Sequence, residues 1–239
     1  MIAPQTPLPC PRFWSRRIGA VLLAAAIGTG GMATLPLRAA ENSGPVLVSR
    51  TGGGGWANVK ELEAAAAKGN PKAEAQFGEL LLRGGEGVAK NEARGVALLE
   101  KAARAGQAPA AFRIGMLLME GEAGVAKDQA RALSYFRAAA AGGEAEAFFN
   151  IGAAYGSARG VKRSYAEALG WLIVARERGA GAGAEENLRT QIARFPAWIA
   201  TGERRAKEIA AEFKDRKVTE FLPPVAPLDA VFDPLKPRL

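Results

Sequence analysis

A repeat of about 37 residues constrains this chain more than any other feature of its sequence. Seven columns of residues keep one phase over three copies, and neighbouring members of a column lie 36 or 37 residues apart. The columns are Gly69, Gly106 and Gly143; Ala73, Ala110 and Ala147; Phe77, Ile114 and Ile151; Gly78, Gly115 and Gly152; Gly87, Gly124 and Gly160; Val88, Val125 and Val161; and Asn91, Asp128 and Ser164. In repeat architectures of this period, each unit buries its apolar residues against the next. The sequence therefore predicts a stack of similar units.

Each copy has the pattern of two helices. In the first helix, apolar residues recur at i, i+4 and i+7 or i+8, which places them on one face. This stripe is Ala73, Phe77 and Leu80/Leu81; Ala110, Ile114 and Leu117/Leu118; and Ala147, Ile151 and Ala154/Tyr155. A glycine follows the middle residue of each stripe (Gly78, Gly115, Gly152), and inside a helix it costs about 1 kcal/mol relative to alanine. We therefore expect the neighbouring helix to cross there with its backbone close.

Glycine-rich turns lead to the second helix, which starts at Asn91, Asp128 or Ser164. These three residue types are good N-caps, because their side-chain oxygens accept hydrogen bonds from unpaired backbone N–H groups. The predicted buried stripe is Val96, Leu98/Leu99 and Ala102; Leu133, Tyr135/Phe136 and Ala139; and Leu169, Trp171/Leu172 and Ala175. We expect the aromatic residues of the repeats (Phe77, Tyr135, Phe136, Phe148 and Trp171) to be core residues, and Tyr165 to be an exposed residue.

Partial repeats are expected at both ends. A lone second helix is predicted from Val59 to Ala65. After the third copy, Leu188, Ile192 and Phe195 form the apolar face of another helix, which we expect Pro196 to stop. The last helix, from about Ala197 to Arg216, is predicted to bury Trp198, Ile209 and Phe213 and to expose Arg204, Arg205, Lys207, Glu208 and Glu212. The predicted fold is an all-α, right-handed α/α solenoid over residues 58–216, with about three full and two partial repeats.

The amino terminus resembles an export signal. In residues 1–40 a basic stretch ends at Arg16-Arg17, an apolar run follows from Ile18 to Ile27, and small residues come next. The expected cleavage is after Ala39 or Ala40, which would make the mature protein periplasmic or secreted. The alternative is an uncleaved membrane anchor, although ten apolar residues are half of the roughly 20 that a spanning helix needs.

Two further segments flank the predicted solenoid. Residues 41–57 contain Gly52 to Gly55 and are predicted to be a flexible linker. Residues 217–239 form a proline-rich tail that also holds apolar residues, including Phe221 and Phe232. Two alternatives stay open for this tail: a disordered end, or an extended strip that packs along the solenoid.

Composition excludes much chemistry. The chain has no histidine, and its one cysteine, Cys10, lies inside the predicted signal, so histidine bases, histidine-bound metals and Ser/His/Asp or Cys/His catalysis are excluded. We expect no metal and no cofactor. The net charge is +8, but four arginines of residues 1–40 supply half of it and the rest is dispersed, so nucleic-acid binding is not expected.

The motifs resemble the Sel-one-like repeat (SLR) family, relatives of tetratricopeptide repeats. Its pattern is Ala-x-x-x-Phe/Ile-Gly, then Gly-x-x-Gly-Val-x-Lys-Asp, then Ala-Leu-x-Tyr/Trp-Phe/Leu, and the best matches are Gly124-Val125, Lys127-Asp128 and residues 168–172. Departures such as Lys90-Asn91 concern only the shape of a turn. Some secreted members pair cysteines and have been linked to penicillin binding; this chain lacks those cysteines, so that property is not carried over. The resemblance implies a non-enzymatic adaptor or regulator in the bacterial cell envelope, with a protein or peptide as partner and no stable membrane insertion of the mature chain.

One line of side chains on the first helices points away from the apolar stripe. It comprises Lys72, Gln76, Glu79 and Arg83; Arg113, Met116 and Glu120; and Glu146, Asn150 and Ser157. The hypothesis is that this line faces a groove and binds the partner; the alternative is a solvated face. A second function class is a cell-wall hydrolase that uses two carboxylates, with Glu86, Glu120 and Glu122 as candidates. A third is a membrane-tethered scaffold, if the signal stays uncleaved.

Overall fold

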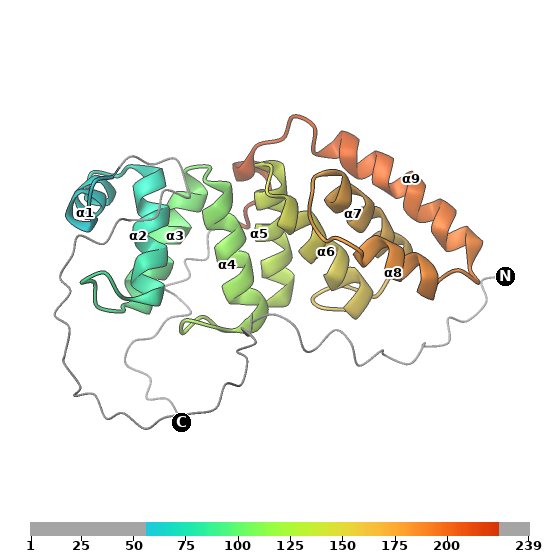
Figure 1. Cartoon of the computed structure of the whole chain (residues 1–239), viewed down its shortest axis with the longest axis horizontal. Helices are drawn as coiled ribbons and strands as arrows, with labels where there is room; N and C mark the ends of the chain where they lie inside the picture. The colour runs from blue at the N-terminus through green and yellow to red at the C-terminus, as the bar shows by residue number, and fades with distance from the viewer. Residues whose placement is uncertain (1–55, 225–239) are drawn as a thin grey trace, which may run out of the picture. The chain divides into compact units, whose positions relative to one another are not determined.

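The structure, a computed structural model, describes residues 56–224, all of which belong to one compact unit. The predicted signal, most of the predicted linker and the tail beyond Pro224 lie outside these residues. The described helices are α1 (Val59–Ala67), α2 (Pro71–Arg83), α3 (Glu92–Arg104), α4 (Ala108–Glu120), α5 (Gln129–Ala141), α6 (Ala145–Ser157), α7 (Tyr165–Glu177), α8 (Ala184–Gln191), α9 (Pro196–Glu212) and the short 3-10 helix η1 (Val218–Glu220) (Figure 1).

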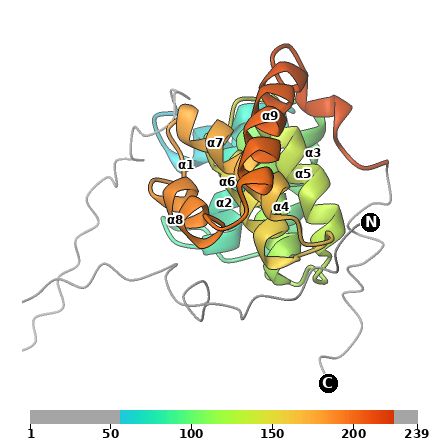
Figure 2. The ribbon, with the colours of Figure 1, turned by 90° about the vertical axis from the view of Figure 1, so that its right-hand side faces the viewer.

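Three helix pairs, α2–α3, α4–α5 and α6–α7, are the three copies of the repeat. The two helices of a pair pack on each other, and successive pairs meet through α3–α4 and α5–α6. The lone helix α1 packs on α2, as the sequence predicts. In Figure 2 the pairs lie one behind another, with α8 and α9 nearest the viewer. The predicted all-α solenoid is therefore confirmed over the described residues.

The apolar stripes of both helices form the core. Phe77, Ile114 and Ile151 of the first helices are buried, as are Leu99, Phe136 and Leu172 opposite them. Phe148 and Trp171 lie 5.9 Å apart between ring centroids, in the range where aromatic pairs attract each other. Phe77, Tyr135, Phe136, Phe148 and Trp171 are all buried, as predicted.

The helical glycines lie where the two helices of a pair cross. A Cβ at Gly78 would stand 3.0 Å from the carbonyl oxygen of Gly95, and one at Gly115 would stand 2.8 Å from the ring of Phe136. Gly152 has the same relation to Leu172, at 3.0 Å. The crossings therefore require the hydrogen side chain, which confirms the close approach that the glycine column predicts.

Local hydrogen bonds start the second helices at the predicted caps. Backbone N–H groups donate to Asn91 Oδ1 (3.0 Å), to Asp128 Oδ1 (2.9 Å) and to Ser164 Oγ (3.2 Å). The first helices end in the left-handed region, at Gly121 with φ 78° and at Ala158 with φ 61°. Glycine adopts this region without strain and alanine does not, so the third copy forms the same turn at a higher energy.

The C-terminal end differs from the prediction in two ways. Helix α8 ends at Gln191, and Pro196 opens α9 instead of stopping the helix before it. Proline suits the first helical position, since it has no N–H to leave unpaired there. Helix α9 ends at Glu212 rather than near Arg216. Its C-cap residue Phe213 is buried, as predicted, against Phe148 and Trp171 at 5.4 and 5.5 Å.

Helix α9 packs along α7 as closely as α6 does on the other side, so α7 is buried all around from Ala168 to Ala175. Three of the residues predicted around α9 are corrected. Glu212, predicted as exposed, is half-buried and lies 3.9 Å from Arg205. Arg205 is not exposed: it is half-buried and pairs with Glu167 of α7 at 3.1 Å. Trp198, predicted as buried, is half-exposed because it lies at the edge of this contact.

The chain then turns back over the stack. Helix η1 packs against α5 and α3, and Val218 is buried beside Gly142. Phe221 stacks on Phe213 with ring centroids 4.9 Å apart. Residues 213–222 therefore fasten the last helix to two earlier repeats.

Gly115→Ala tests the helix crossing. The added methyl group would overlap Phe136, and overpacking of this kind costs about 1–3 kcal/mol, which outweighs the roughly 1 kcal/mol that alanine gains in helix propensity. We expect a lower free energy of unfolding in urea.

Gly156→Ala in α6 is the control, because a Cβ there would meet only the Ala168 methyl group, at 3.8 Å. It should be neutral or stabilising. Equal effects of both substitutions would contradict the argument.

Candidate interaction surface

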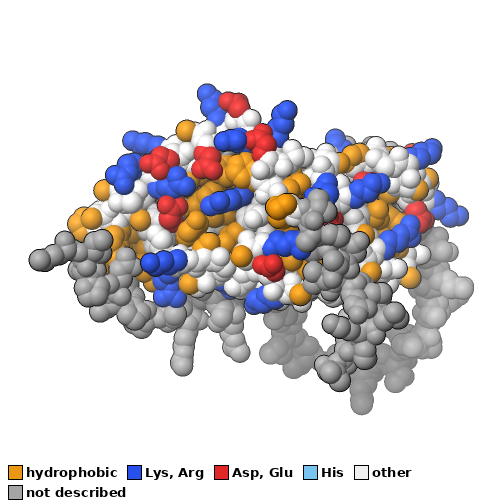
Figure 3. All heavy atoms as spheres, turned by 180° about the vertical axis from the view of Figure 1, so that it is seen from behind, with side chains coloured by type: hydrophobic (Ala, Val, Ile, Leu, Met, Phe, Trp, Pro, Cys, Tyr) orange, Lys and Arg blue, Asp and Glu red, His pale blue; other side chains and the backbone are white. Residues whose placement is uncertain are grey.

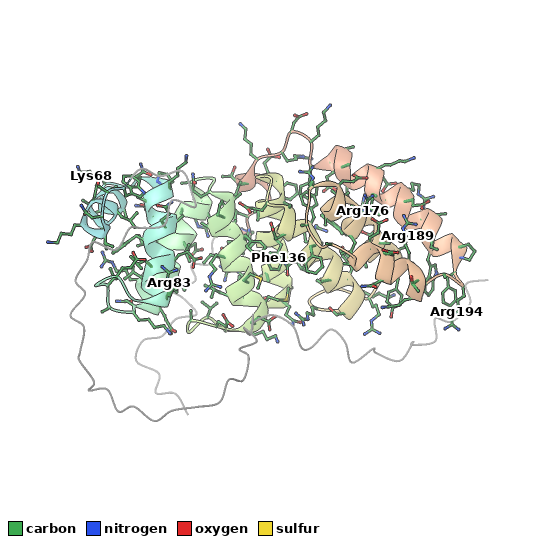
Figure 4. All side chains as sticks on the ribbon, in the orientation of Figure 1. Lys68, Arg83, Phe136, Arg176, Arg189 and Arg194 are labelled. Atoms are coloured by element: carbon green, nitrogen blue, oxygen red, sulfur yellow. The ribbon has the colours of Figure 1, made fainter. Side chains whose placement is uncertain are left out.

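The predicted line of side chains lies on α2, α4 and α6, beside the buried stripes. Lys72, Arg83, Glu120 and Glu146 are exposed, whereas Gln76, Glu79, Arg113, Met116, Asn150 and Ser157 are half-buried. Figure 4 labels Arg83, on the last turn of α2. Because the three helices belong to one stacked frame, the line continues from one repeat to the next. We call it the first-helix line.

Two ion pairs link neighbouring repeats along this line. Arg113 Nε of α4 lies 3.1 Å from Glu79 Oε1 of α2. Glu120 Oε1 of α4 accepts a hydrogen bond from Arg159, in the turn after α6, at 3.2 Å. The structure therefore brings Glu79 and Arg113 together, while Glu120 pairs with a residue outside the predicted set.

The middle of the line is neutral. Met116 and Asn150 lie on neighbouring first helices, and the Asn150 amide donates to the Glu146 carbonyl oxygen one turn earlier, at 2.9 Å. This bond fixes the direction of the amide group, whose oxygen remains an acceptor. Methionine adapts its shape to different apolar surfaces. A flexible apolar group and an oriented amide thus stand between two charged pairs.

Burial controls the charge of Glu79. Its loss of solvent raises the pKa of the carboxyl above the ordinary value, and the nearby Arg113 and Arg83 only partly offset this. The seam between the first two repeats therefore holds a carboxylate whose negative charge is disfavoured relative to water.

Sequence reasoning missed three buried acids. Glu74 is 1% exposed and binds Lys101, Glu185 is 8% exposed and binds Arg176 and Arg189, and Glu100 binds Arg104 and the Tyr135 hydroxyl group. For Glu74 a signal was present, because it shares one repeat column with Ala111 and Phe148, both fully buried. Each acid lies beside a cation, as buried charges require, so we assign them to structure.

The carboxylates proposed for a hydrolase are placed differently. Glu86 lies 3.6 Å from Arg83, Glu120 binds Arg159, and Glu122 is exposed in a turn. A catalytic carboxylic acid works in a desolvated site, whereas all three of these residues are exposed. Within residues 56–224 no group of three or more acids could hold a metal ion.

Tyr165 is half-buried, not fully exposed, because its ring stacks on Trp198 at 5.8 Å. On the rear face, Figure 3 shows hydrophobic patches with acidic and basic side chains interleaved among them. None of the helices from α1 to α9 has the length and apolar composition that crossing a bilayer requires.

Glu185→Gln and Glu79→Gln should have opposite consequences. Burial tends to raise the pKa of Glu185, but hydrogen bonds from Arg189 and Arg176 outweigh it and hold the pKa below the ordinary value. The ionised group thus stabilises the fold at neutral pH, and this stability is lost as the pH falls through the lowered pKa. Glu185→Gln should lower stability by about 1–2 kcal/mol at pH 7, with a smaller deficit near pH 3.

For Glu79 the sign is reversed, since its pKa is raised: its charge opposes folding at neutral pH, and stability is gained as the pH falls through the raised pKa. Glu79→Gln should therefore leave the melting temperature at pH 7 unchanged or higher. A larger loss for Glu79→Gln than for Glu185→Gln would refute this assignment.

Comparison with known proteins identifies the repeat. The Sel1 repeat family matches residues 71–107, 108–144 and 145–179. No curated protein matches the chain. Among solved structures, a Sel1 repeat protein from Oxalobacter formigenes is similar at 26% identity and a TM-score of 0.49, over 55% of this chain and 96% of that one.

A protective antigen present in uropathogenic Escherichia coli strains, which displays an SLR fold, is similar at 21% identity and a TM-score of 0.46. That match covers 75% of this chain and 44% of the antigen. The three matched segments coincide with the pairs α2–α3, α4–α5 and α6–α7. Residues 71–179 therefore contain three Sel1 repeats, and Sel1 repeats generally form a helical scaffold for protein–protein interaction.

Proposed function

We propose that this protein is an exported, non-enzymatic adaptor of the bacterial cell envelope that holds a segment of a partner protein along the first-helix line. The observation that carries the proposal is the continuity of this line over three Sel1 repeats joined by ion pairs. Export rests on the basic, apolar and small-residue pattern of residues 1–40.

The chemistry of the line suits a peptide or a helix. Met116 offers an adaptable apolar contact, and Asn150 offers an oriented amide oxygen. The flanking pairs Glu79–Arg113 and Glu120–Arg159 can exchange partners with charged groups at both ends of a bound segment. Since only a few contacts supply most of the affinity in such interfaces, we expect Met116 and Asn150 to be the anchors.

Photo-crosslinking tests the surface. A crosslinking amino acid at position 116, compared with one at position 134 on α5, should give a discrete adduct from position 116 only. The triple variant Gln76→Ala, Arg113→Ala and Asn150→Ala should weaken capture of the identified partner by at least about tenfold.

The control triple variant is Ser134→Ala, Lys214→Ala and Thr219→Ala, which removes the same charge outside the first helices. It should bind as the wild type does. If the folded first-helix triple variant still captured the partner as well as the wild type does, the first-helix line would be rejected as the binding surface.

Amino-terminal sequencing of the protein from the producing cell tests the export proposal. A start near Ala40 or Glu41 supports a cleaved, periplasmic or secreted form. A start at Met1 in a membrane fraction would support the tethered scaffold instead, and a start at Met1 in the cytosol would reject export.

A further inference from the structure

Three half-exposed aromatic rings stack at the C-terminal end of the repeats. Trp198 of α9 lies between Tyr165, at 5.8 Å, and Phe195, at 4.2 Å, and the rings are within 26° of parallel. All three side chains remain partly exposed. We call this group the aromatic stack. Monomeric proteins seldom leave grouped apolar side chains on the surface without a binding role.

The packing of α7 and α9 explains why the stack forms. Tyr165 meets Trp198, Gly202 lies against Leu169, and Gly170 lies against Ala206. The contacts advance together along both helices, so α7 and α9 run parallel with their N-termini side by side. Each helix N-terminus carries about half a positive charge, and two of them therefore adjoin the aromatic stack.

The side chains nearby add positive charge. Lys162 and Arg163 precede α7, Arg194 precedes α9, and no acid occurs in residues 159–166 or 192–202. Arg194 lies over the Phe195 ring at 5.8 Å, and Figure 4 shows it at the far end of the helices. Lys162 and Arg194 have no ion-pair partner within residues 56–224.

The arginines of α9, Arg204 and Arg205, pair with acids, as does Arg189 of α8. Arg205 lies within 4 Å of Glu167, Glu208 and Glu212, and Arg189 binds both Glu185 and Glu203. The stack therefore combines apolar surface with a local excess of positive charge, in contrast to the paired surface of α9 beyond it.

We propose that the aromatic stack, with Lys162 and Arg194, is a second docking surface, which binds an acidic peptide segment containing apolar or proline residues. Complementary charge favours an acidic partner, and the edges of parallel rings form ridges between which apolar side chains fit. This surface is distinct from the first-helix line.

Fluorescence anisotropy with the full chain tests the proposal. The probe is a labelled twelve-residue peptide that repeats Glu-Leu-Pro, and its counterpart repeats Lys-Leu-Pro. The acidic peptide should bind at least about tenfold more tightly than the basic one, with weaker binding at 200 mM than at 50 mM salt. Lys162→Glu with Arg194→Glu should reduce its affinity by at least about tenfold.

The matched control is Lys60→Glu with Lys68→Glu, which makes the same change in net charge on exposed residues of α1 and its cap. This control should change the affinity for the acidic peptide by less than about threefold, because the two charges lie on a different helix from the aromatic stack. Trp198→Ala, with an unchanged circular dichroism spectrum, should lower affinity without changing the salt dependence.

Three results would overturn the proposal. The control pair could weaken binding as much as Lys162→Glu with Arg194→Glu, which would mean non-specific attraction. Vesicles containing phosphatidylglycerol could bind while the acidic peptide does not, which would assign the surface to a membrane. The first-helix triple variant could abolish peptide binding while the charge reversal leaves it intact, which would place the peptide on the first-helix line.

Discussion

The close crossing of two helices within each repeat is the contact on which the rest of the structure depends. Gly78, Gly115 and Gly152 allow the second helix to approach until side chains or carbonyl oxygens touch the backbone of the first. In the second and third repeats the short separation places both apolar stripes in one shared core, whereas the stripe of α2 forms a second cluster with Leu62 and Ala66 of α1. All six helices of the three pairs are 13 residues long. Because the lengths are equal, the crossings determine where equivalent surface residues lie in each pair, including those of the first-helix line.

Periodicity made most of the fold predictable. The columns of glycine, alanine and large apolar residues defined where helices cross, and Asn91, Asp128 and Ser164 defined where second helices start. The C-terminal end was less predictable because the repeat stops there. Pro196 is compatible with both the end of one helix and the start of the next, and only the packing of Phe213 and Trp198 against earlier helices decides between them.

The surface was predictable only in part. Helical spacing predicted a line of side chains that point away from the core, but the pairing of Glu79 with Arg113, 34 residues later in the chain, depends on how closely α2 and α4 lie together. The buried acids are a similar case, because Glu74 occupies a position that alanine or phenylalanine fills in the next two repeats. The aromatic stack joins residues from segments that lie on either side of α8, and no local pattern indicated their contact.

Helix α9 also sets the length of the array. It packs along α7, on the side where the first helix of a further repeat would otherwise pack. Residues 213–222 then lead from α9 back to α5 and α3. A duplication that lengthened this protein would therefore have to occur upstream of α7, where each new pair meets an ordinary neighbour. Evolution can enlarge the molecule from the N-terminal side while its last helix, and the arginines and rings around it, keep their geometry.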